Sequence, residues 1–541
     1  MKKVLFLIII AFAIIDVGCC QSVVNAVKCV QLDPLEKVFL EESNFVENSD
    51  TAAVAKGETA TFQFVINSAY PIEGLKIDAG YLVNGKQKIA ATLKAFVGYI
   101  LSECRANPHS KDAFFPVSNI YPDCLQEVSS IDVSPMQNQP TWISYAIPHD
   151  AAAGNYSAKI VFTGKVNGKS IKITKKVNAK VYPVTLPDQT LWISNWFTLE
   201  GLPKMNRNQP VEPYSDRYWE LLTALANVLR DHGNNAYQIR DMAYHCNPQL
   251  VGTQYSFDFT NFDKFVELLI REGNLKRILG GHLGDYHGIE VPNVGTIPFD
   301  DEIAQNFLSQ YLPALYSHLK SKGWDKMYMQ SIADEPIYGY IQSYIRIADF
   351  VKKLMPDIPI IDAGTTHATI DIVDVWVPLL ENFHKDYHHF QQRQAAGDEV
   401  WFYTCTAPKG NYANRFLELP LIQTRFLHWI NYRYGATGYL HWGFNWWHYS
   451  TTNSACADGQ DWPGGDIWIV YPVEGKVYSS IRLAAMRDGI ADYELLKLLE
   501  QKSPEKAKEL AREVIHDFNS YNSNIHAFRV TRLKLLKLLS E

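Results

Sequence analysis

Between residues 190 and 480, short apolar runs alternate with longer amphipathic stretches, and this alternation constrains the fold more than any other feature. A run such as Val400 to Thr404 has the length of a buried strand, whereas Tyr214 to Asp231 carries its leucines on one helical face. Eight strand-helix units in succession predict a (β/α)8 TIM-like barrel over residues 190–480. The strand-like runs lie at residues 191–197, 235–239, 276–280, 327–333, 358–363, 373–377, 400–404 and 438–442.

Residues 23–185 follow a different pattern, in which short β-branched runs are separated by turns. Phe62, Phe64 and Ile66 lie at alternate positions and share one face of a strand, and Asn167-Gly168 is a hairpin signal. Because the segment has regular strands and no helical stretch, it predicts a β-sandwich domain. We expect this domain to support the barrel, and sugar binding by it is the alternative, since a fold alone does not specify a function.

Two further boundaries complete the domain organisation. Pro183 and Pro187 disfavour both helix and central strand, and they separate the sandwich from the barrel. After the barrel, residues 481–541 show helical periodicity, with Met486 and Ile490 on one apolar face. This part of the chain is predicted to form C-terminal helices that cap the barrel.

Residues 1–20 have the pattern of an export signal, because two lysines precede an apolar stretch from Val4 to Ile15. Val17-Gly18-Cys19 is similar to the end of a bacterial lipoprotein signal, in which Cys19 would carry the lipid anchor. Asp16 stands where that pattern prefers leucine, and Cys20 offers a second frame. We therefore expect an exported, lipid-anchored protein of the periplasm or outer membrane.

Charge and cysteine usage narrow the possible partners. The sequence has 51 basic and 58 acidic residues, a net charge of -7, and no dense basic run, which argues against a nucleic-acid partner. It contains no CxxC or HExxH spacing, so we expect no metal and no cofactor.

The cysteines of the exported chain are candidates for disulfides. Cys104 and Cys124 bracket a loop-like segment and are predicted to pair in an oxidising compartment. Cys246, Cys405 and Cys456 have no evident partner in the sequence.

The segment from Met327 to Pro336, MYMQSIADEP, ends the fourth predicted strand in two adjacent carboxylates, Asp334 and Glu335. Two like charges this close disfavour joint ionisation, so one of them can keep a proton near neutral pH. The alternative is a helix N-terminal cap, where acidic residues are also favourable. Active sites of (β/α)8 barrels lie at the C-terminal strand ends, and this position favours a catalytic role for both acids.

A pair of carboxylates suits the hydrolysis of a glycosidic bond. Such a reaction needs a proton donor for the leaving oxygen and a group that stabilises positive charge at the sugar carbon. The seventh predicted strand ends in Tyr403-Thr404-Cys405, without a carboxylate, and Asp398 and Glu399 lie at its start. This absence favours substrate-assisted catalysis, in which a 2-acetamido oxygen of the substrate attacks.

The strand end Ala333-Asp334-Glu335-Pro336, the segment from Arg487 to Glu494 and the sandwich-barrel order resemble glycoside hydrolase family 123. The resemblance covers nearly all of the chain after the signal. It implies an exo-acting, retaining β-N-acetylgalactosaminidase that forms an oxazoline-type intermediate from a β-GalNAc-terminated glycan or glycolipid. It also implies that Asp334 stabilises the acetamido group, that Glu335 is the general acid/base, and that Arg487 pairs with Asp492.

Other candidate substrate contacts rest on their positions at predicted strand ends. Indole rings can stack on a sugar face, and hydroxyl, amide and imidazole groups can bind sugar hydroxyls or the acetamido carbonyl. Ordinary core packing is the alternative for each of them. The candidates are Asn235, His245, His282, Tyr403, Trp442 and Trp446, with Asp285 and Trp447 beside them.

Two other functions remain open at this point. The protein could be a glycan-binding lipoprotein without catalysis, which would bind sugar without releasing any from an aryl β-hexosaminide. It could also be a barrel glycosidase for another sugar, such as GlcNAc.

Overall fold

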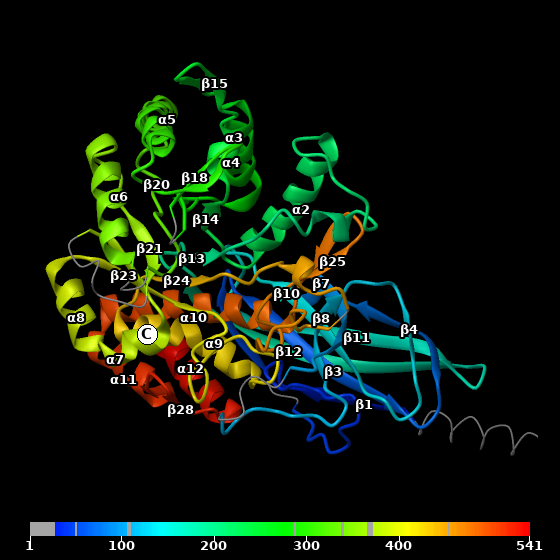
Figure 1. Cartoon of the computed structure of the whole chain (residues 1–541). Helices are drawn as coiled ribbons and strands as arrows, with labels where there is room; N and C mark the ends of the chain where they lie inside the picture. Colours follow the sequence, from blue (N-terminus) through cyan, green and yellow to red (C-terminus); the bar gives the residue numbers. More distant parts are fainter. Residues whose placement is uncertain are drawn as a thin grey trace, which may run out of the picture.

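The computed structural model describes residues 27–48, 51–104, 110–285, 288–336, 340–364, 372–452 and 454–541. The expected signal and the anchor at Cys19 lie outside these ranges. Figure 1 shows the N-terminal strands on one side of the molecule and the strand-helix units on the other, with the C-terminal helices beside both. None of the described helices combines the length and apolar character that crossing a bilayer requires.

The N-terminal region is rich in β-structure and has two main sheets. Their strand orders are β1-β3-β10-β7-β8 and β2-β12-β11-β4-β9, with the β5–β6 hairpin attached to β11. Phe62, Phe64 and Ile66 are buried in the core that the sheets share, where Phe64 packs on Phe162 with ring centres 5.4 Å apart. The strands are β1 Val27–Leu32, β2 Ala52–Lys56, β3 Thr59–Ser68, β4 Ile72–Ala79, β5 Leu82–Asn84, β6 Gln87–Ile89, β7 Leu93–Leu101, β8 Ile120–Gln126, β9 Ile131–Val133, β10 Gln139–Ala146, β11 Gly154–Val166 and β12 Lys169–Thr185.

The strand-helix region contains a parallel strand at or near each of the eight predicted positions. Their ladders form a five-stranded sheet, β13-β24-β23-β22-β21, and a three-stranded sheet, β14-β17-β20. The fold class is therefore confirmed as multidomain, with a sheet-rich N-terminal region, but the eight strands do not form one continuous sheet. The strands are β13 Trp192–Asn195, β14 Ala236–Ile239, β17 Arg277–Gly280, β20 Tyr328–Met329, β21 Ile361–Gly364, β22 Val375–Pro378, β23 Glu399–Thr404 and β24 Gly438–His441.

The two parallel sheets meet through single hydrogen bonds rather than ladders. On one side, the Gln330 N–H donates to the Pro359 carbonyl at 2.9 Å, and the Gln330 carbonyl accepts the Ile361 N–H at 3.0 Å. On the other side, the Asn235 N–H donates to the Ile193 carbonyl at 3.1 Å. One apolar cluster takes a side chain from each of the eight strands, namely Trp192, Ala236, Leu279, Met329, Ile361, Val375, Trp401 and Leu440.

Helices follow most of these strands, as the amphipathic pattern predicts. The predicted helix over residues 380–394 divides at Asp386 into α7 and α8. The helices and short elements of this region are η1 Leu202–Met205, α2 Asp216–Asp231, α3 Met242–His245, α4 Thr260–Gly273, α5 Glu302–Lys322, α6 Ile341–Leu354, α7 Leu380–Lys385, α8 Tyr387–Ala396, α9 Leu421–Tyr434 and η4 Trp447–Tyr449. Hairpins are formed by β15 Gln249–Val251 with β16 Gln254–Ser256, β18 Ile289–Val291 with β19 Gly295–Ile297, and β25 Tyr471–Val473 with β26 Lys476–Tyr478.

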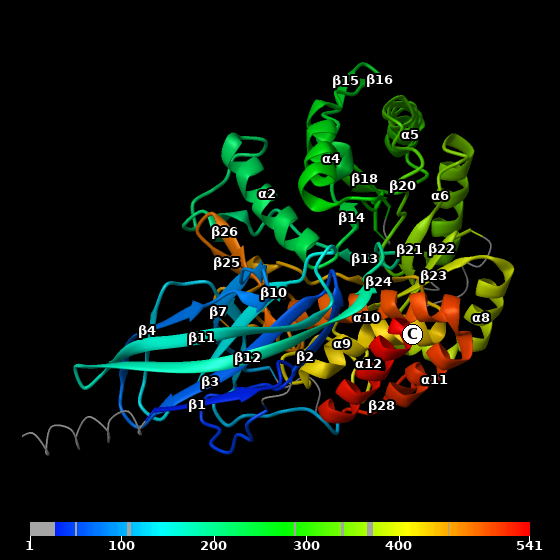
Figure 2. The same ribbon diagram turned by 180° about the vertical axis from the view of Figure 1, so that it is seen from behind.

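The C-terminal helices contact both other regions, as Figure 2 shows from behind. The Arg532 guanidinium donates to the Ala53 carbonyl at 2.7 Å, and Arg529 pairs with Asp33 of the N-terminal region at 2.7 Å. The elements are α10 Ile481–Lys502, α11 Pro504–Val514, β27 Ile515–Asp517, β28 Ser520–Tyr521 and α12 Ile525–Ser540.

The predicted ion pair between Arg487 and Asp492 is wrong. Arg487 pairs with the adjacent Asp488 at 2.7 Å, whereas buried Asp492 accepts hydrogen bonds from Arg425 and Arg532, each at 2.7 Å. Positions five apart on a helix point to different faces, because only residues three or four apart are neighbours. Asp492 therefore joins α10 to α9 and α12.

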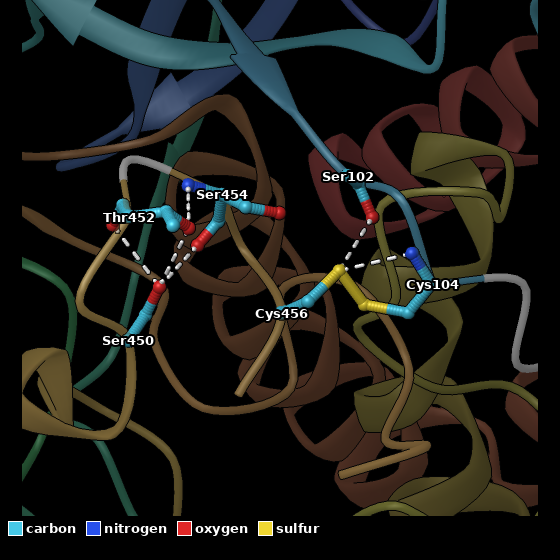
Figure 3. Close-up of a disulfide and its surroundings, with 6 residues drawn as sticks. All are labelled: Ser102, Cys104, Ser450, Thr452, Ser454 and Cys456. Atoms are coloured by element: carbon cyan, nitrogen blue, oxygen red, sulfur yellow. Dashed lines mark hydrogen bonds between the residues drawn. A yellow bond between two sulfur atoms is a disulfide. The ribbon is translucent and has the colours of Figure 1, made fainter. Parts of the chain in front are cut away.

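The predicted Cys104–Cys124 disulfide is also wrong, because Cys104 pairs with Cys456, with Cα atoms 6.0 Å apart (Figure 3). Cys124 lies opposite Gly98 in the β7–β8 ladder, and its buried thiol is free. Cys104 lies beyond the end of β7, where the chain reaches the long loop after β24. The disulfide thus connects the N-terminal region to the strand-helix region.

Candidate active site

The acid pair lies where the fourth parallel strand gives way to the turn before α6. Glu335 has a φ of +44°, in the left-handed region that non-glycine residues rarely occupy. Its backbone N–H donates to the Ala363 carbonyl of β21 at 3.1 Å, which holds this conformation in place. Strained backbone that the surroundings maintain is common at functional sites.

Asp362 of β21 holds the chain segment that leads into the acid pair. Its carboxylate accepts hydrogen bonds from the Ile332 N–H at 2.9 Å, from the Tyr344 hydroxyl at 2.6 Å and from the Ser331 hydroxyl. Burial raises the pKa of Asp362 to about 7, and the nearby charge of Asp334 adds to this rise. Asp362 thereby positions the strand end that carries Asp334 and Glu335.

Asp334 has a strongly raised pKa of about 7, although solvent reaches the residue. Desolvation by the surrounding protein is the largest cause, and the negative charge of Glu335 is the second. Arg240 acts in the opposite direction and lowers this pKa. Asp334 is therefore poised to exist in both protonation states near neutral pH.

Tyr403 of β23 contacts the second acid directly. Its buried hydroxyl donates a hydrogen bond to Oε1 of Glu335. Burial and then the charge of Glu335 raise the pKa of Tyr403 well above its ordinary value, so the phenol stays neutral and remains a donor. The strand-end position of Tyr403 in the sequence thus corresponds to a place beside Glu335.

Arg240 is a site residue that the sequence analysis missed. It directly follows Ile239, the last residue of β14, and its guanidinium lies 4.7 Å from the ring centre of Trp446. Since it also acts electrostatically on Asp334, it joins the acid pair to the aromatic residues after β24. The available signal was a cation placed immediately after a parallel strand.

His282 lies close to this arginine. Its ring packs edge-on against Trp196, with centres 5.5 Å apart, and its Nε2 lies 3.4 Å from the amide nitrogen of Gln238. Burial and then the positive charge of Arg240 lower the pKa of His282 to about 3, so the imidazole is neutral. The structure therefore brings His282 into the electrostatic environment of Arg240.

Asn235 and His245 are bonded to other parts of the protein. Asn235 precedes β14, at the opposite end of the parallel strands, and its amide bonds to the Ile193 N–H at 2.9 Å and to the Leu191 carbonyl at 3.0 Å. His245 packs against Phe265, and its Nδ1 shares a hydrogen bond with the Tyr214 hydroxyl at 2.9 Å. The polar groups of both residues thus have partners within the protein.

The tryptophans after β24 fall into two groups. Trp442 and Trp446 lie with ring centres 5.4 Å apart, and their Nε1 groups donate to Asp466 at 2.9 Å and to the Trp442 carbonyl at 2.6 Å. The polar edges of both indoles are therefore turned toward protein. Trp447 is buried and donates to the Val470 carbonyl at 2.8 Å, which makes it a packing residue.

Across the described ranges, no three His, Cys, Asp or Glu side chains converge in a way that would hold a metal ion.

Comparisons with known proteins agree on one family. The model for the "Glycoside hydrolase 123, catalytic domain" matches residues 196–499, and the model for the "Glycoside hydrolase 123 N-terminal domain" matches residues 40–164. A family 123 glycoside hydrolase from Clostridium perfringens, described in terms of glycolipid glycan hydrolysis, superposes with a TM-score of 0.74. It is 17% identical, and the match covers 95% of this chain and 97% of that one.

Other likenesses are weaker. An endo-beta-1,4-mannanase from Thermotoga petrophila is 12% identical over 57% of this chain and 77% of its own, with a TM-score of 0.35, which is too low to support an argument. A comparison with curated protein sequences finds no match.

Proposed function

The chain belongs to glycoside hydrolase family 123, and from this membership we propose that it releases terminal β-linked N-acetylgalactosamine from glycans or glycolipids. The observation that carries the proposal is the adjacent pair Asp334 and Glu335, with the Tyr403 hydroxyl on Glu335 and no carboxylate where β23 ends. The description of the Clostridium perfringens relative, which concerns glycolipid glycans, supports the substrate class.

The proposal includes the closure of the eight parallel strands into one barrel. The hydrogen bonds of Gln330 and Asn235 between the two sheets support closure, as does the apolar cluster to which all eight strands contribute. Closure brings the C-terminal strand ends to one rim, where such barrels carry their active sites. An experimental structure with an open seam between β13 and β14 would contradict it.

In the proposed mechanism, the substrate supplies its own nucleophile. The acetamido oxygen attacks the anomeric carbon as the bond to the leaving oxygen breaks, and Glu335 gives its proton to that oxygen. The Asp334 carboxylate accepts a hydrogen bond from the acetamido N–H and offsets the positive charge of the oxazoline-type intermediate. Glu335 then takes a proton from the water that opens the ring, and the configuration is retained.

Tyr403 has a specific role in these reaction steps. Its hydroxyl donates to Glu335 in the free protein, and we propose that it transfers this hydrogen bond to the acetamido oxygen when substrate binds. The transfer would hold the nucleophilic oxygen beneath the anomeric carbon and would free Glu335 to act as an acid.

One assay tests substrate and mechanism together. Aryl β-GalNAc and aryl β-GlcNAc are compared side by side, with a thiazoline mimic of the cyclic intermediate as inhibitor. Selective cleavage of the GalNAc substrate with tight inhibition is expected, since transition-state and intermediate mimics bind far more tightly than substrates.

The assay also separates the alternatives. Sugar binding without release would favour a glycan-binding protein, and preferential cleavage of the GlcNAc substrate would change the assigned sugar. Cleavage of a galactoside that lacks the acetamido group would contradict substrate assistance.

We also propose that the protein is exported and anchored by a lipid on Cys19. The support is the signal-like pattern of residues 1–20, which precedes the described structure. Replacing Cys19 with alanine should move the protein from the membrane fraction to the soluble fraction of the producing cell. A wild-type protein that is already soluble, or acylated at Cys20 instead, would contradict this assignment.

A further inference from the structure

Four aromatic rings after β24 form a continuous cluster, which we call the aromatic platform: Trp442, Trp446, Tyr449 and Trp462. Trp446 and Tyr449 stack with ring centres 5.4 Å apart and an angle of 18° between their planes. Trp462 packs edge-on against Trp442 at 5.4 Å and against Tyr449 at 5.8 Å. Each ring therefore contacts at least two others.

The platform is unevenly covered. Trp446 is 5% exposed, whereas Tyr449 is 38% exposed in spite of its ring contacts, and Trp442 and Trp462 are half-buried. Arg240 covers Trp446 from the side of β14. A rigid aromatic surface that reaches solvent offers an apolar face to a ligand without needing to rearrange.

The platform also lies beside the acid pair. Arg240 contacts Trp446 and acts electrostatically on Asp334, so one side chain touches the platform and influences the first acid. Trp442 packs against the apolar cluster that contains Tyr403, whose hydroxyl contacts Glu335. Trp446 and Trp442 are thus the rings of the platform that are linked to the reacting groups, and Tyr449 and Trp462 contact these rings.

The N-terminal region holds the loop that carries the platform. The disulfide joins Cys104 to Cys456 (Figure 3). The Ala455 N–H donates to the Leu101 carbonyl at 2.8 Å. Two residues further on, the Asp458 N–H donates to the carbonyl of Tyr449 at 2.8 Å. The position of Tyr449 is thereby linked to the end of β7.

We propose that Tyr449 and Trp462 form a subsite for the sugar to which the cleaved residue is attached, and that the Cys104–Cys456 disulfide holds this subsite in place. The inference rests on the proposed function. The carbon faces of these two rings would stack on the C–H face of a neutral sugar ring, because Tyr449 is exposed and Trp462 is half-buried. The preferred substrate would then carry a second sugar rather than a small aglycone.

The test compares a substrate that reaches the subsite with one that does not. The ratio of kcat/KM for β-GalNAc-galactose disaccharides to kcat/KM for aryl β-GalNAc is measured for Tyr449→Ala, for Trp462→Ala and for the unmodified protein. We expect the ratio to fall about tenfold in either variant, which corresponds to ~1.4 kcal/mol. Tyr81→Ala is the matched control, because Tyr81 is 57% exposed on the N-terminal region between β4 and β5.

Other results would overturn the subsite. An unchanged ratio would do so, as would an equal loss on both substrates, which would indicate a role for the rings at the cleaved sugar or in folding. If the unmodified protein cleaves neither substrate, the proposed function is refuted. The subsite is then tested by calorimetric titration of the protein with the disaccharides. Binding that is equal in the unmodified protein and Tyr449→Ala would refute it.

The disulfide has its own test. The double variant Cys104→Ser/Cys456→Ser should lower the same ratio several-fold while circular dichroism shows a folded protein. Cys29→Ser is the control, since Cys29 is a free, half-buried cysteine of the N-terminal region. A double variant that loses thermal stability but keeps its ratio would show that the disulfide stabilises the fold and does not position the subsite.

Discussion

The protein shifts the pKa values of Asp334 and Asp492 in opposite directions. Burial alone would raise the pKa of Asp492, but Arg425 and Arg532 outweigh it and lower that pKa to about 2. At Asp334, burial and the charge of Glu335 outweigh Arg240, and the pKa rises to about 7. The difference is the number and placement of the cations, and it separates an acid that joins helices from one that can exchange a proton.

This contrast also explains the two acid-rich segments of the sequence. The strand end at Asp334 and the segment from Arg487 to Glu494 both lie within the matched catalytic domain, yet they contribute in different ways. Asp492 accepts four hydrogen bonds, two from Arg425 and one each from Arg532 and Trp429, and its charge is satisfied. Asp334 lies beside a second carboxylate, so its environment favours proton exchange rather than a role in holding helices together.

The largest expected effect is loss of catalysis at the acid pair. Glu335→Gln and Asp334→Asn should each lower kcat/KM by about 100- to 10,000-fold, because each removes a proton-transfer or charge-stabilising group. Thermal unfolding should change little. Glu505→Gln is the control, since its side chain is 83% exposed and pairs only with Lys508 among the contacts resolved. Wild-type rates in the double variant of the acid pair would refute the proposed mechanism.

The second prediction concerns Asp492, whose removal should destabilise the fold. Asp492→Ala should lower the free energy of unfolding by ~3–5 kcal/mol, because it leaves two buried arginines without their shared partner. Urea unfolding measures the loss. The matched control is Glu381→Gln, which removes the exposed pair with Lys385 and should cost less than ~1 kcal/mol. Similar losses in the two variants would show that Asp492 is not the stronger link.

Asp492 also makes a prediction for acid stability. Its folded-state pKa lies below the ordinary value of 3.8, so its stabilising effect is present above that value and is lost as pH falls toward about 2. The difference in unfolding free energy between the unmodified protein and Asp492→Asn should therefore shrink between pH 4 and about 2. A difference that stays constant over this range would contradict the assigned ion pairs.

Removing the phenol should have an intermediate effect. Tyr403→Phe keeps the ring and deletes the hydroxyl that contacts Glu335 and that we propose to hold the acetamido oxygen, so kcat should fall about tenfold or somewhat more. Steady-state kinetics with the aryl substrate measure it. A change in KM alone would assign the hydroxyl to ground-state binding instead.

The smallest expected effect is a shift in the pH profile. If the ionised form of Asp334 is the active one, kcat/KM should rise with pH through an apparent pKa near 7. Arg240 lowers this pKa, so Arg240→Gln should move the acidic limb to higher pH, and Arg240→Lys should move it less. A limb that does not move would show that another group titrates there.

Much of the fold could be predicted from periodicity. The positions of the eight parallel strands follow from short apolar runs between amphipathic stretches, since each element must bury one face. The acid pair could be found because Asp334 and Glu335 directly follow such a run. Arg240 occupies an equivalent position after β14, but a single cation after a strand is too common a pattern to identify a site.

Contacts between distant segments could not be predicted in the same way. Cys104 and Cys456 are 352 positions apart, and no local pattern distinguishes that pairing from Cys104 with Cys124. Arg487 and Asp492 are close in sequence and opposite in charge, yet the helix turns them to different faces. Asn235 flanks a predicted strand, but it lies at the end of β14 that is opposite the acids.

The local order of residues in the sequence thus accounts for the helices, the strands and the adjacent acids, because periodicity and neighbouring charge act over a few residues. The three-dimensional packing settled which cations surround each carboxylate, since desolvation and electrostatic interactions depend on distance in space rather than along the chain. That packing gives Asp334 a pKa of about 7 and Asp492 one of about 2. It also connects the N-terminal region to the loop that carries the aromatic platform, through Cys104 and Cys456.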